Sequence, residues 1–463
     1  MYYILEDTIR VRKWKNSKPY YYTAEGKRKL FPLDREEYGL LKACDALTDL
    51  VASDALYRLE MMGVIRRCRK GEASLKADQF REYANYFFRD IDWTITERCN
   101  YNCLHCFHAS DNSRLRAEFS REEALRFLKE AAECGILGIR LTGGEPTLYP
   151  HFREVLQEMK SLGLPLDTLI TNGAILDEEL IGFVKSLHPW AQIMLSFDGI
   201  GTHDWLRQHE GAEAQVKNTI RLCKNAGMYV KINMNANRRN RNGIFDSAVM
   251  LADMGVDEVR IIKTTEAPRW QLNAGNDSLT IGEYYDLSAE FAGLYKTRGL
   301  TLPVTIWQSL YLDGKRKAFI ILPVKSSECN YREDALICNA MMRKISVQAN
   351  GDIIPCAPLA GLYTLLGIQM GNVKRESLQQ LLTEGPFVEN VRHTAGEKRQ
   401  YSQKCGSCRH FKNCQGGCPA LSMLFSGSLL GPDVYKCAFY SGNWYNTFCN
   451  VLEGWENATP IGV

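Results

Sequence analysis

Cys99, Cys103 and Cys106 form a CxxxCxxC run inside the segment CNYNCLHC, and their spacing suits metal chemistry. Three thiolates spaced in this way can hold one iron–sulfur cluster and leave one of its irons without a protein ligand. An open metal position suits catalysis, whereas a closed set of four ligands suits structure or electron transfer. The alternative is a zinc site that borrows a histidine such as His105 or His108. The spacing favours a catalytic iron–sulfur site, with zinc as the alternative.

A second run is Thr142-Gly143-Gly144-Glu145-Pro146. Paired glycines let the backbone approach a ligand closely, and the Glu145 carboxylate adds a hydrogen-bond acceptor. Taken alone, this run is more typical of a turn from a strand to a helix.

Together the two runs resemble the radical S-adenosylmethionine (SAM) superfamily, whose signature is CxxxCxxC after the first strand and GGE after the second. The resemblance implies a [4Fe–4S] cluster on Cys99, Cys103 and Cys106, with SAM chelated at its open iron. It also implies that the GGEP residues hold SAM at its amino group: Gly143, Gly144, Glu145 and Pro146. The activity it implies is reductive cleavage of SAM to a 5′-deoxyadenosyl radical, which removes a hydrogen atom from substrate.

The same resemblance implies further cofactor contacts. Ser196, in LSFDG, resembles the family's ribose contact on the fourth strand, and Arg207 and Asn235 are expected to contact SAM by their position. His105 stands where the family has an aromatic residue near the adenine. Asp198 is expected to cap a turn.

Seven more cysteines follow an ordered pattern near the C-terminus that resembles the SPASM domain, a carrier of two auxiliary [4Fe–4S] clusters. The resemblance puts Cys338, Cys356 and Cys418 on auxiliary cluster I, with Cys329 as its expected fourth ligand. It assigns the remaining four cysteines to auxiliary cluster II: Cys405, Cys408, Cys414 and Cys437. Five cysteines outside these sets are expected to be structural: Cys44, Cys68, Cys134, Cys223 and Cys449.

The elements that must position these residues alternate between strand and helix. Strand patterns lie at residues 91–96, 136–141, 166–170, 192–196, 228–233 and 258–262. One intervening helix begins at Ser120, where Glu123 completes a capping-box pattern, and another covers residues 151–162. Six consecutive βα units predict a parallel sheet, and a partial barrel fits better than an open sheet. Ligands then bind beyond the carboxyl ends of the strands.

The N-terminal segment has a winged-helix pattern. Residues 2–14 and 20–31 read as strands, Asp34 and Ser53 can cap two helices, and residues 64–69 would form one side of a wing. Such a module can bind DNA. It also resembles the peptide-recognition element ahead of SPASM-type peptide maturases, in which the leader of a precursor peptide adds a strand to the sheet edge. We favour leader binding.

The composition is that of a globular protein: 463 residues, 45% hydrophobic and 24% charged, with a net charge of +3. No apolar run approaches the roughly 20 residues of a membrane helix, and no signal-peptide pattern opens the chain. We expect a cytoplasmic protein without nucleic-acid or membrane partners.

The expected domains are residues 1–80 for peptide recognition, 88–310 for the α/β partial (βα)6 barrel and 320–450 for SPASM. Because nine of the sixteen cysteines lie between residues 329 and 449, metal is expected to hold that segment together more than an apolar core does.

These resemblances imply a radical SAM peptide maturase with SAM and three [4Fe–4S] clusters. It would install an oxidative crosslink, a thioether or carbon–carbon bond, in a ribosomally made precursor peptide, and an external reductant such as flavodoxin or ferredoxin would supply electrons. Two alternatives stay open. One is a formylglycine-forming enzyme like the anaerobic sulfatase maturases, and the other is a multi-cluster electron-transfer protein without catalysis.

Overall fold

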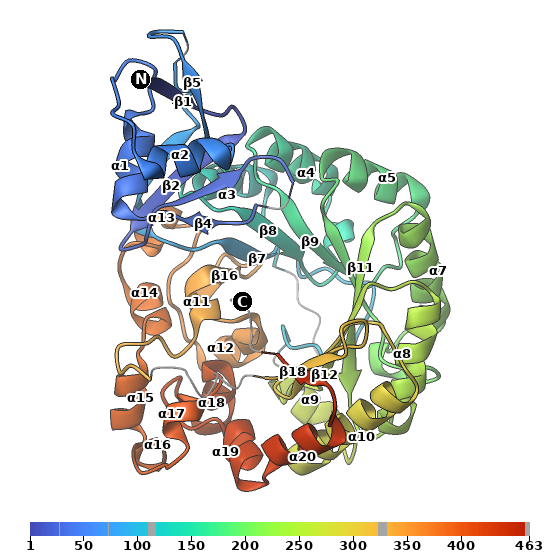
Figure 1. Ribbon diagram of the computed structural model, residues 1–463. Helices are drawn as coiled ribbons and strands as arrows, with labels where there is room; N and C mark the ends of the chain where they lie inside the picture. The colour runs from blue at the N-terminus through green and yellow to red at the C-terminus, as the bar shows by residue number, and fades with distance from the viewer. Residues whose placement is uncertain (27, 73, 110–116, 323–330, 459–463) are drawn as a thin grey trace.

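The residues that the computed structural model describes are 1–26, 28–72, 74–109, 117–322 and 331–458 (Figure 1). Cys329 lies outside them. Figure 1 shows the N-terminal elements in blue at one end, an arc of strands and helices from cyan to yellow, and orange and red helices that face the arc from the other side.

Six parallel strands form the centre of the fold. They are β7 (Asp90–Thr94), β8 (Gly138–Thr142), β9 (Leu166–Thr171), β10 (Gln192–Ser196), β11 (Tyr229–Ala236) and β12 (Glu258–Lys263). Each pairs in parallel with the next one along the chain. The predicted α/β fold with six consecutive βα units is therefore confirmed, with strand ends that are identical or differ by up to three residues.

Helices connect these strands. Those between β7 and β12 are α3 (Arg121–Glu133), α4 (Phe152–Ser161), α5 (Glu178–Leu187), α6 (His203–Arg207), α7 (Ala212–Asn225) and α8 (Ile244–Asp253). Two 3₁₀ turns, η1 (Pro146–Leu148) and η2 (Arg241–Gly243), precede α4 and α8. The predicted capping box is present at α3, where Ser120 accepts from the Glu123 amide and Glu123 accepts from the Ser120 amide.

Alternation along the strands separates the core from the barrel interior. In β11 the apolar residues Val230, Ile232 and Met234 are fully buried in the large core shared with the helices. Asn233 and Asn235 alternate with them and are only partly buried, on the opposite face of the strand. The barrel interior is therefore lined partly by polar groups, as a ligand site requires.

Further strands extend this sheet at both edges. After α9 (Pro268–Asn273) and α10 (Ile281–Thr297), the chain adds β13 (Val304–Ile306), β14 (Leu310–Asp313) and β15 (Ala318–Ile321), and the late β18 (Glu456–Asn457) pairs with β15. At the other edge β16 (Lys344–Val347) pairs in parallel with β7 and leads to β17 (Ile353–Ile354). The C-terminal segment thus continues the barrel's own sheet.

The N-terminal region holds two small sheets and two helices. The strands are β1 (Tyr2–Leu5), β2 (Ile9–Lys15), β3 (Tyr20–Thr23), β4 (Phe31–Pro32), β5 (Ile65–Cys68) and β6 (Phe80–Tyr86). The helices α1 (Arg35–Ala43) and α2 (Asp54–Met61) are capped by Asp34 and Ser53, as predicted.

The prediction of one strand over residues 2–14 is wrong. The chain turns at Glu6, and the two halves enter different sheets, β1 beside β5 and β2 between β3 and β6. Because β6 pairs with β2 in parallel, the N-terminal sheet reaches residue 86.

The C-terminal segment is mostly helical. Its helices are α11 (Asn339–Arg343), η3 (Ala357–Leu359), α12 (Ala360–Leu366), α13 (Leu378–Leu381), α14 (Pro386–Val391), α15 (Ala395–Tyr401), α16 (Gln403–Gly406), α17 (Phe411–Cys414), α18 (Pro419–Ser426), α19 (Val434–Ser441) and α20 (Trp444–Val451). Its apolar side chains, Phe387 and Phe439 among them, are buried in the same core cluster as the barrel. The segment therefore shares a substantial apolar core with the barrel, although its short helices show little apolar periodicity in sequence, and the expectation that metal contributes more to its stability stays a prediction.

Among the residues that the structure describes, no helix is long and apolar enough to cross a membrane.

Candidate functional site: three groups of cysteines

The first group of cysteines follows β7, at the carboxyl edge of the parallel sheet. Cys99 Sγ accepts a hydrogen bond from the Tyr101 amide at 3.4 Å, and a turn links the Cys106 amide to the Cys103 carbonyl at 3.4 Å. Burial raises the pKa of Cys99 to about 12, and burial also raises the pKa of Cys106. These two thiols are therefore neutral near pH 7 unless a metal displaces their protons.

Gly143 and Gly144 lie directly against the backbone that leads into this loop. The Gly144 amide donates to the Thr96 carbonyl at 2.7 Å. A Cβ on Gly143 would lie 2.6 Å from the Thr96 carbonyl oxygen, and one on Gly144 would lie 2.5 Å from the Arg98 carbonyl oxygen. The paired glycines are therefore required at least for the close approach of two backbone segments, a reason that the sequence alone did not reveal.

The Glu145 carboxylate is fully buried and joins the ends of two strands. Its Oε1 accepts from the Thr147 amide at 3.2 Å and from the hydroxyls of Thr147 and Thr171 at 2.6 and 2.7 Å. Among the described residues, its Oε2 accepts from the Asn172 amide alone, at 2.8 Å. Because a carboxylate oxygen can accept more than one hydrogen bond, Oε2 can accept another from an ammonium group. Pro146 follows as the first residue of η1.

Asp198 binds several polar side chains at the carboxyl edge of the parallel sheet. Its carboxylate is fully buried and accepts from Arg207 Nε at 2.6 Å, from the Asn235 amide at 2.9 Å and from Asn235 Nδ2 at 3.0 Å, with His203 Nδ1 at 3.2 Å. Burial opposes ionisation, but Arg207 and His203 hold the pKa of Asp198 well below its usual range. The prediction that Asp198 caps a turn does not include these partners, of which His203 and Arg207 lie in α6 and Asn235 lies near the end of β11.

Arg207 and Asn235, two of the residues expected to contact the cofactor, both bind Asp198 and lie close to the cysteine loop. Arg207 Nη1 lies 3.8 Å from Cys103 Sγ, and Asn235 Nδ2 lies 3.1 Å from His105 Nε2. Burial, followed by repulsion from Arg207, lowers the pKa of His105 to about 3, so its ring is neutral. Ser196 ends β10 and is partly buried. The structure thus brings Ser196, Arg207 and Asn235 to the edge that carries the first cysteines.

The zinc alternative gains no support from this geometry. His105 Nε2 faces Asn235, and His108 Nδ1 lies 3.2 Å from Gln348 Oε1. Throughout the described chain, no three His, Cys, Asp or Glu side chains are gathered closely enough to hold one metal ion. An iron–sulfur cluster is itself several atoms wide, so its thiolates stand further apart than the ligands of one ion.

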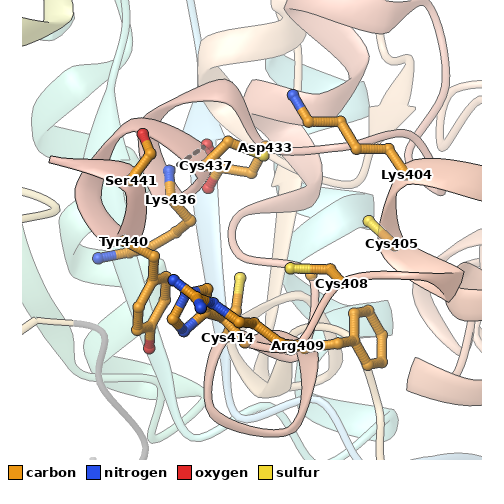
Figure 2. Close-up of a pocket in the computed structure, with 13 residues that line it drawn as sticks. Lys404, Cys405, Cys408, Arg409, Cys414, Asp433, Lys436, Cys437, Tyr440 and Ser441 are labelled. Atoms are coloured by element: carbon orange, nitrogen blue, oxygen red, sulfur yellow. Dashed lines mark hydrogen bonds between the residues drawn. The ribbon is translucent and has the colours of Figure 1, made fainter.

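A second group of cysteines surrounds a cavity of about 300 Å³ in the C-terminal segment. Figure 2 shows the thiols of Cys405, Cys408 and Cys414 pointing into a common space, with Cys437 of α19 opposite. Lys404, Arg409 and Lys436 also contribute to the lining. The four cysteines that the resemblance assigns to auxiliary cluster II thus line one cavity, together with these three cationic side chains and Asp433.

The third group consists of Cys338, Cys356 and Cys418, which precede α11, η3 and α18 directly. The three thiols are close enough for Cys338 and Cys356 to act with burial in raising the pKa of Cys418. Burial raises the pKa of Cys356 to about 12.

Asp433 joins the second and third groups, and no spacing in the sequence marks it. Its Oδ2 accepts from the Cys418 amide at 2.8 Å, and its carbonyl accepts from the Cys437 amide at 3.0 Å. Gly417 has a φ of +69°, and any Cβ there would overlap the Asp433 carboxylate. The Gly416–Gly417 turn therefore lets Asp433 approach closely enough to bind the backbone of both cysteine groups.

The remaining cysteines belong to none of the three groups. Cys44, Cys134 and Cys223 are buried, whereas Cys68 and Cys449 are partly buried.

Family models match two parts of the chain. Residues 93–238 match the radical SAM superfamily, and residues 338–410 match SPASM, described as an iron–sulfur cluster-binding domain. The chain therefore contains a radical SAM domain and a SPASM domain. The radical SAM domain includes the first cysteine group and the glycine pair. The SPASM match includes Cys338, Cys356, Cys405 and Cys408.

The proteins that this chain resembles in sequence have different functions. The chain is 24% identical over 359 residues to the AdoMet-dependent heme synthase of Methanosarcina barkeri, covering 76% of this chain and 97% of the relative. It is 23% identical over 329 residues to the subtilosin biosynthesis protein AlbA of Bacillus subtilis, covering 68% of this chain and 65% of AlbA.

Among solved structures, Streptococcus suis SuiB bound to S-adenosylmethionine superposes with a TM-score of 0.65 at 16% identity, covering 93% of this chain and 98% of SuiB. SuiB has also been solved with its precursor peptide SuiA, with a TM-score of 0.64. At this identity the likeness establishes a shared fold.

Proposed function

We propose that this protein is a radical SAM peptide maturase that installs an oxidative side-chain crosslink, a thioether or carbon–carbon bond, in a ribosomally made precursor peptide. The observation that carries the proposal is the combination, in one chain, of a radical SAM domain, two further cysteine groups and an N-terminal region with sheets of its own. AlbA and SuiB support it, since one is a bacteriocin biosynthesis protein and the other binds a precursor peptide.

In this proposal Cys99, Cys103 and Cys106 hold the cluster that binds SAM. Glu145 Oε2 and the glycine pair face the amino group, and Arg207 is the cation that Asp198 keeps in place beside Cys103. SAM bound there supplies, on reductive cleavage, the radical that removes a hydrogen atom from the peptide. The buried neutral His105 contributes one side of the adenine site, and its Nδ1 has no hydrogen-bond partner within the described chain.

The C-terminal cysteines are proposed to hold two auxiliary [4Fe–4S] clusters. Cys338, Cys356 and Cys418 hold the first, with Cys329 as fourth ligand. The second is held by Cys405, Cys408, Cys414 and Cys437, which share one cavity. The 5′-deoxyadenosyl radical would take one hydrogen atom from the peptide, and closing the crosslink would release one proton to solvent and one electron. The auxiliary clusters that these cysteines would hold could accept that electron, so that SAM and the clusters would be the oxidants required.

We propose that the N-terminal domain binds the leader of the precursor at the free edge of β5. Within the described residues β5 pairs only with β1, and α2 packs next to it. Tyr57 and Met61 of α2 are 61% and 69% exposed, one helical turn apart. Arg66 and Arg67 of β5 lie beside this apolar face, where they pair with Glu72 and Glu60, and the carboxylates of a leader would compete for them. Such an edge can accept an acidic and apolar peptide strand.

The iron and sulfide content after anaerobic reconstitution is the first test. Three cubane clusters predict about twelve irons per chain, and about four would leave only the radical SAM site. The second test incubates the loaded enzyme with SAM, reductant and candidate precursor peptides, chosen from any short reading frames that lie beside its gene. We expect 5′-deoxyadenosine and a peptide that has lost two hydrogens.

Other outcomes identify the alternatives. Conversion of a cysteine or serine to an aldehyde would indicate formylglycine formation. Absence of SAM binding by the fully loaded protein would indicate an electron carrier. SAM cleavage with peptide but no loss of two hydrogens would contradict the crosslink.

A further inference from the structure

Two lysines lie buried between the second and third cysteine groups. Lys398 of α15 and Lys436 of α19 are 0% and 1% exposed. Lys398 Nζ donates to Ser422 Oγ at 2.8 Å and lies 3.4 Å from the Leu429 carbonyl. Lys436 Nζ donates to the Leu322 carbonyl at 2.7 Å, with the Gln308 carbonyl at 3.4 Å. All these acceptors are neutral.

Burying an ammonium group is costly unless a negative charge accompanies it. Within the described chain no carboxylate lies at ion-pair distance from either Nζ. Asp433 is the acid whose charge acts on both lysines, and its oxygens already accept from the Cys418 and Tyr435 amides. Since one buried carboxylate can balance only one of the two ammonium groups, a net positive charge remains in the interior.

The cysteine groups supply the missing negative charge. The stem of Lys398 packs against Gly416, in the turn that joins Cys414 to Cys418, so closely that a Cβ on Gly416 would overlap it. Lys436 lines the cavity of the second group, and its Nζ turns from the thiols toward the Leu322 carbonyl (Figure 2). As neutral thiols these cysteines carry no charge, but four thiolates on a cluster exceed the positive charge of its iron–sulfur core.

We propose that Lys398 and Lys436 act as internal cations that raise the reduction potentials of the two auxiliary clusters. The inference rests on the proposed function. An oxidised cluster that gains one electron becomes more negative by one charge, and a fixed positive charge in a buried site stabilises that state. In catalysis the electron comes from the peptide radical, and in the test below it comes from dithionite. Neither lysine binds iron, so both are positioning charges and not ligands.

The test isolates the auxiliary clusters by replacing Cys99, Cys103 and Cys106 with alanine. The full chain is reconstituted anaerobically and titrated with dithionite in the presence of redox mediators, and the reduced clusters are followed by electron paramagnetic resonance. Lys398→Gln removes the charge and Lys398→Arg keeps it. Lys412→Gln, at an exposed lysine of α17, is the matched control.

We expect Lys398→Gln to shift the auxiliary midpoint potential to more negative values, while Lys398→Arg and Lys412→Gln stay near the parent. Loss of cluster loading in Lys398→Gln that Lys398→Arg restores also supports a charge role. An unshifted potential at full iron loading would overturn the inference, as would loss of loading in both Lys398 variants. Absence of auxiliary iron in the parent would instead refute the proposed cofactors.

Discussion

Replacing Asp198 with asparagine keeps the side chain's shape and removes its charge, so it measures what the buried carboxylate does for the site. Asp198 accepts from Arg207 and Asn235 in a fully buried position, and asparagine would leave the Arg207 guanidinium without its counter-charge. Breaking a buried ion pair in this way costs about 3–5 kcal/mol. SAM affinity is expected to fall as well, because Arg207 loses the group that aims it at the cofactor site.

Asp257 offers a matched control at the other end of β11. It accepts from the Val230 amide and from Lys224, as Asp198 accepts from the Asn235 amide and Arg207. Its side chain is 28% exposed, so Asp257→Asn should cost only about 0.2–1 kcal/mol in ion pairing. It should also leave SAM affinity unchanged, since it lies at the amino edge of the sheet.

The assay combines urea denaturation with equilibrium dialysis of SAM for both variants. The folded-state pKa of Asp198 is depressed, so its contribution is present above the unfolded value of about 3.9 and is lost as the pH falls through the folded value. The difference from the parent should therefore be constant between pH 6 and 8. Equal losses for Asp198→Asn and Asp257→Asn, with SAM affinity intact, would refute the reasoning.

Three further predictions test other parts of the molecule. Gly144→Ala should place Cβ against the Arg98 carbonyl, destabilise the loop by about 1–3 kcal/mol and lower iron loading at the first site, measured by iron analysis and thermal melting. His105 is neutral with a pKa of about 3, so the parent should lose stability as the pH falls below about 6.5, and His105→Gln should remove part of that loss in urea titrations at several pH values. Tyr57→Ala with Met61→Glu should weaken precursor binding by about 1–2 kcal/mol, roughly tenfold in Kd by fluorescence anisotropy, without changing the iron content; unchanged affinity would contradict leader binding at α2.

Much of the radical SAM core could be predicted from sequence because its signals are local. Alternating apolar residues and capping pairs such as Ser120 with Glu123 act within one or two turns of chain, and they predict the same elements in any context. The cysteine spacings are equally local, since a loop of a few residues limits how far apart its thiols can lie. The grouping of Cys405, Cys408 and Cys414 around one cavity follows that logic.

Contacts between distant segments were decided by the tertiary structure. Nothing in the sequence marks the pairing of β16 with β7, the break of the first strand at Glu6, or Asp198 as the partner of Arg207 and Asn235. The burial of Lys398 is likewise invisible, because lysine in sequence normally predicts a surface.

The physical reason is that each of these features depends on which surfaces meet when the barrel, its strand ends and the C-terminal helices pack. Sequence by itself determined the cysteine spacings, from which the cluster chemistry is proposed, and the order of the βα units. Packing alone decided which charges would lie beside the cysteines, because burial and electrostatic partners exist only once those segments are brought together.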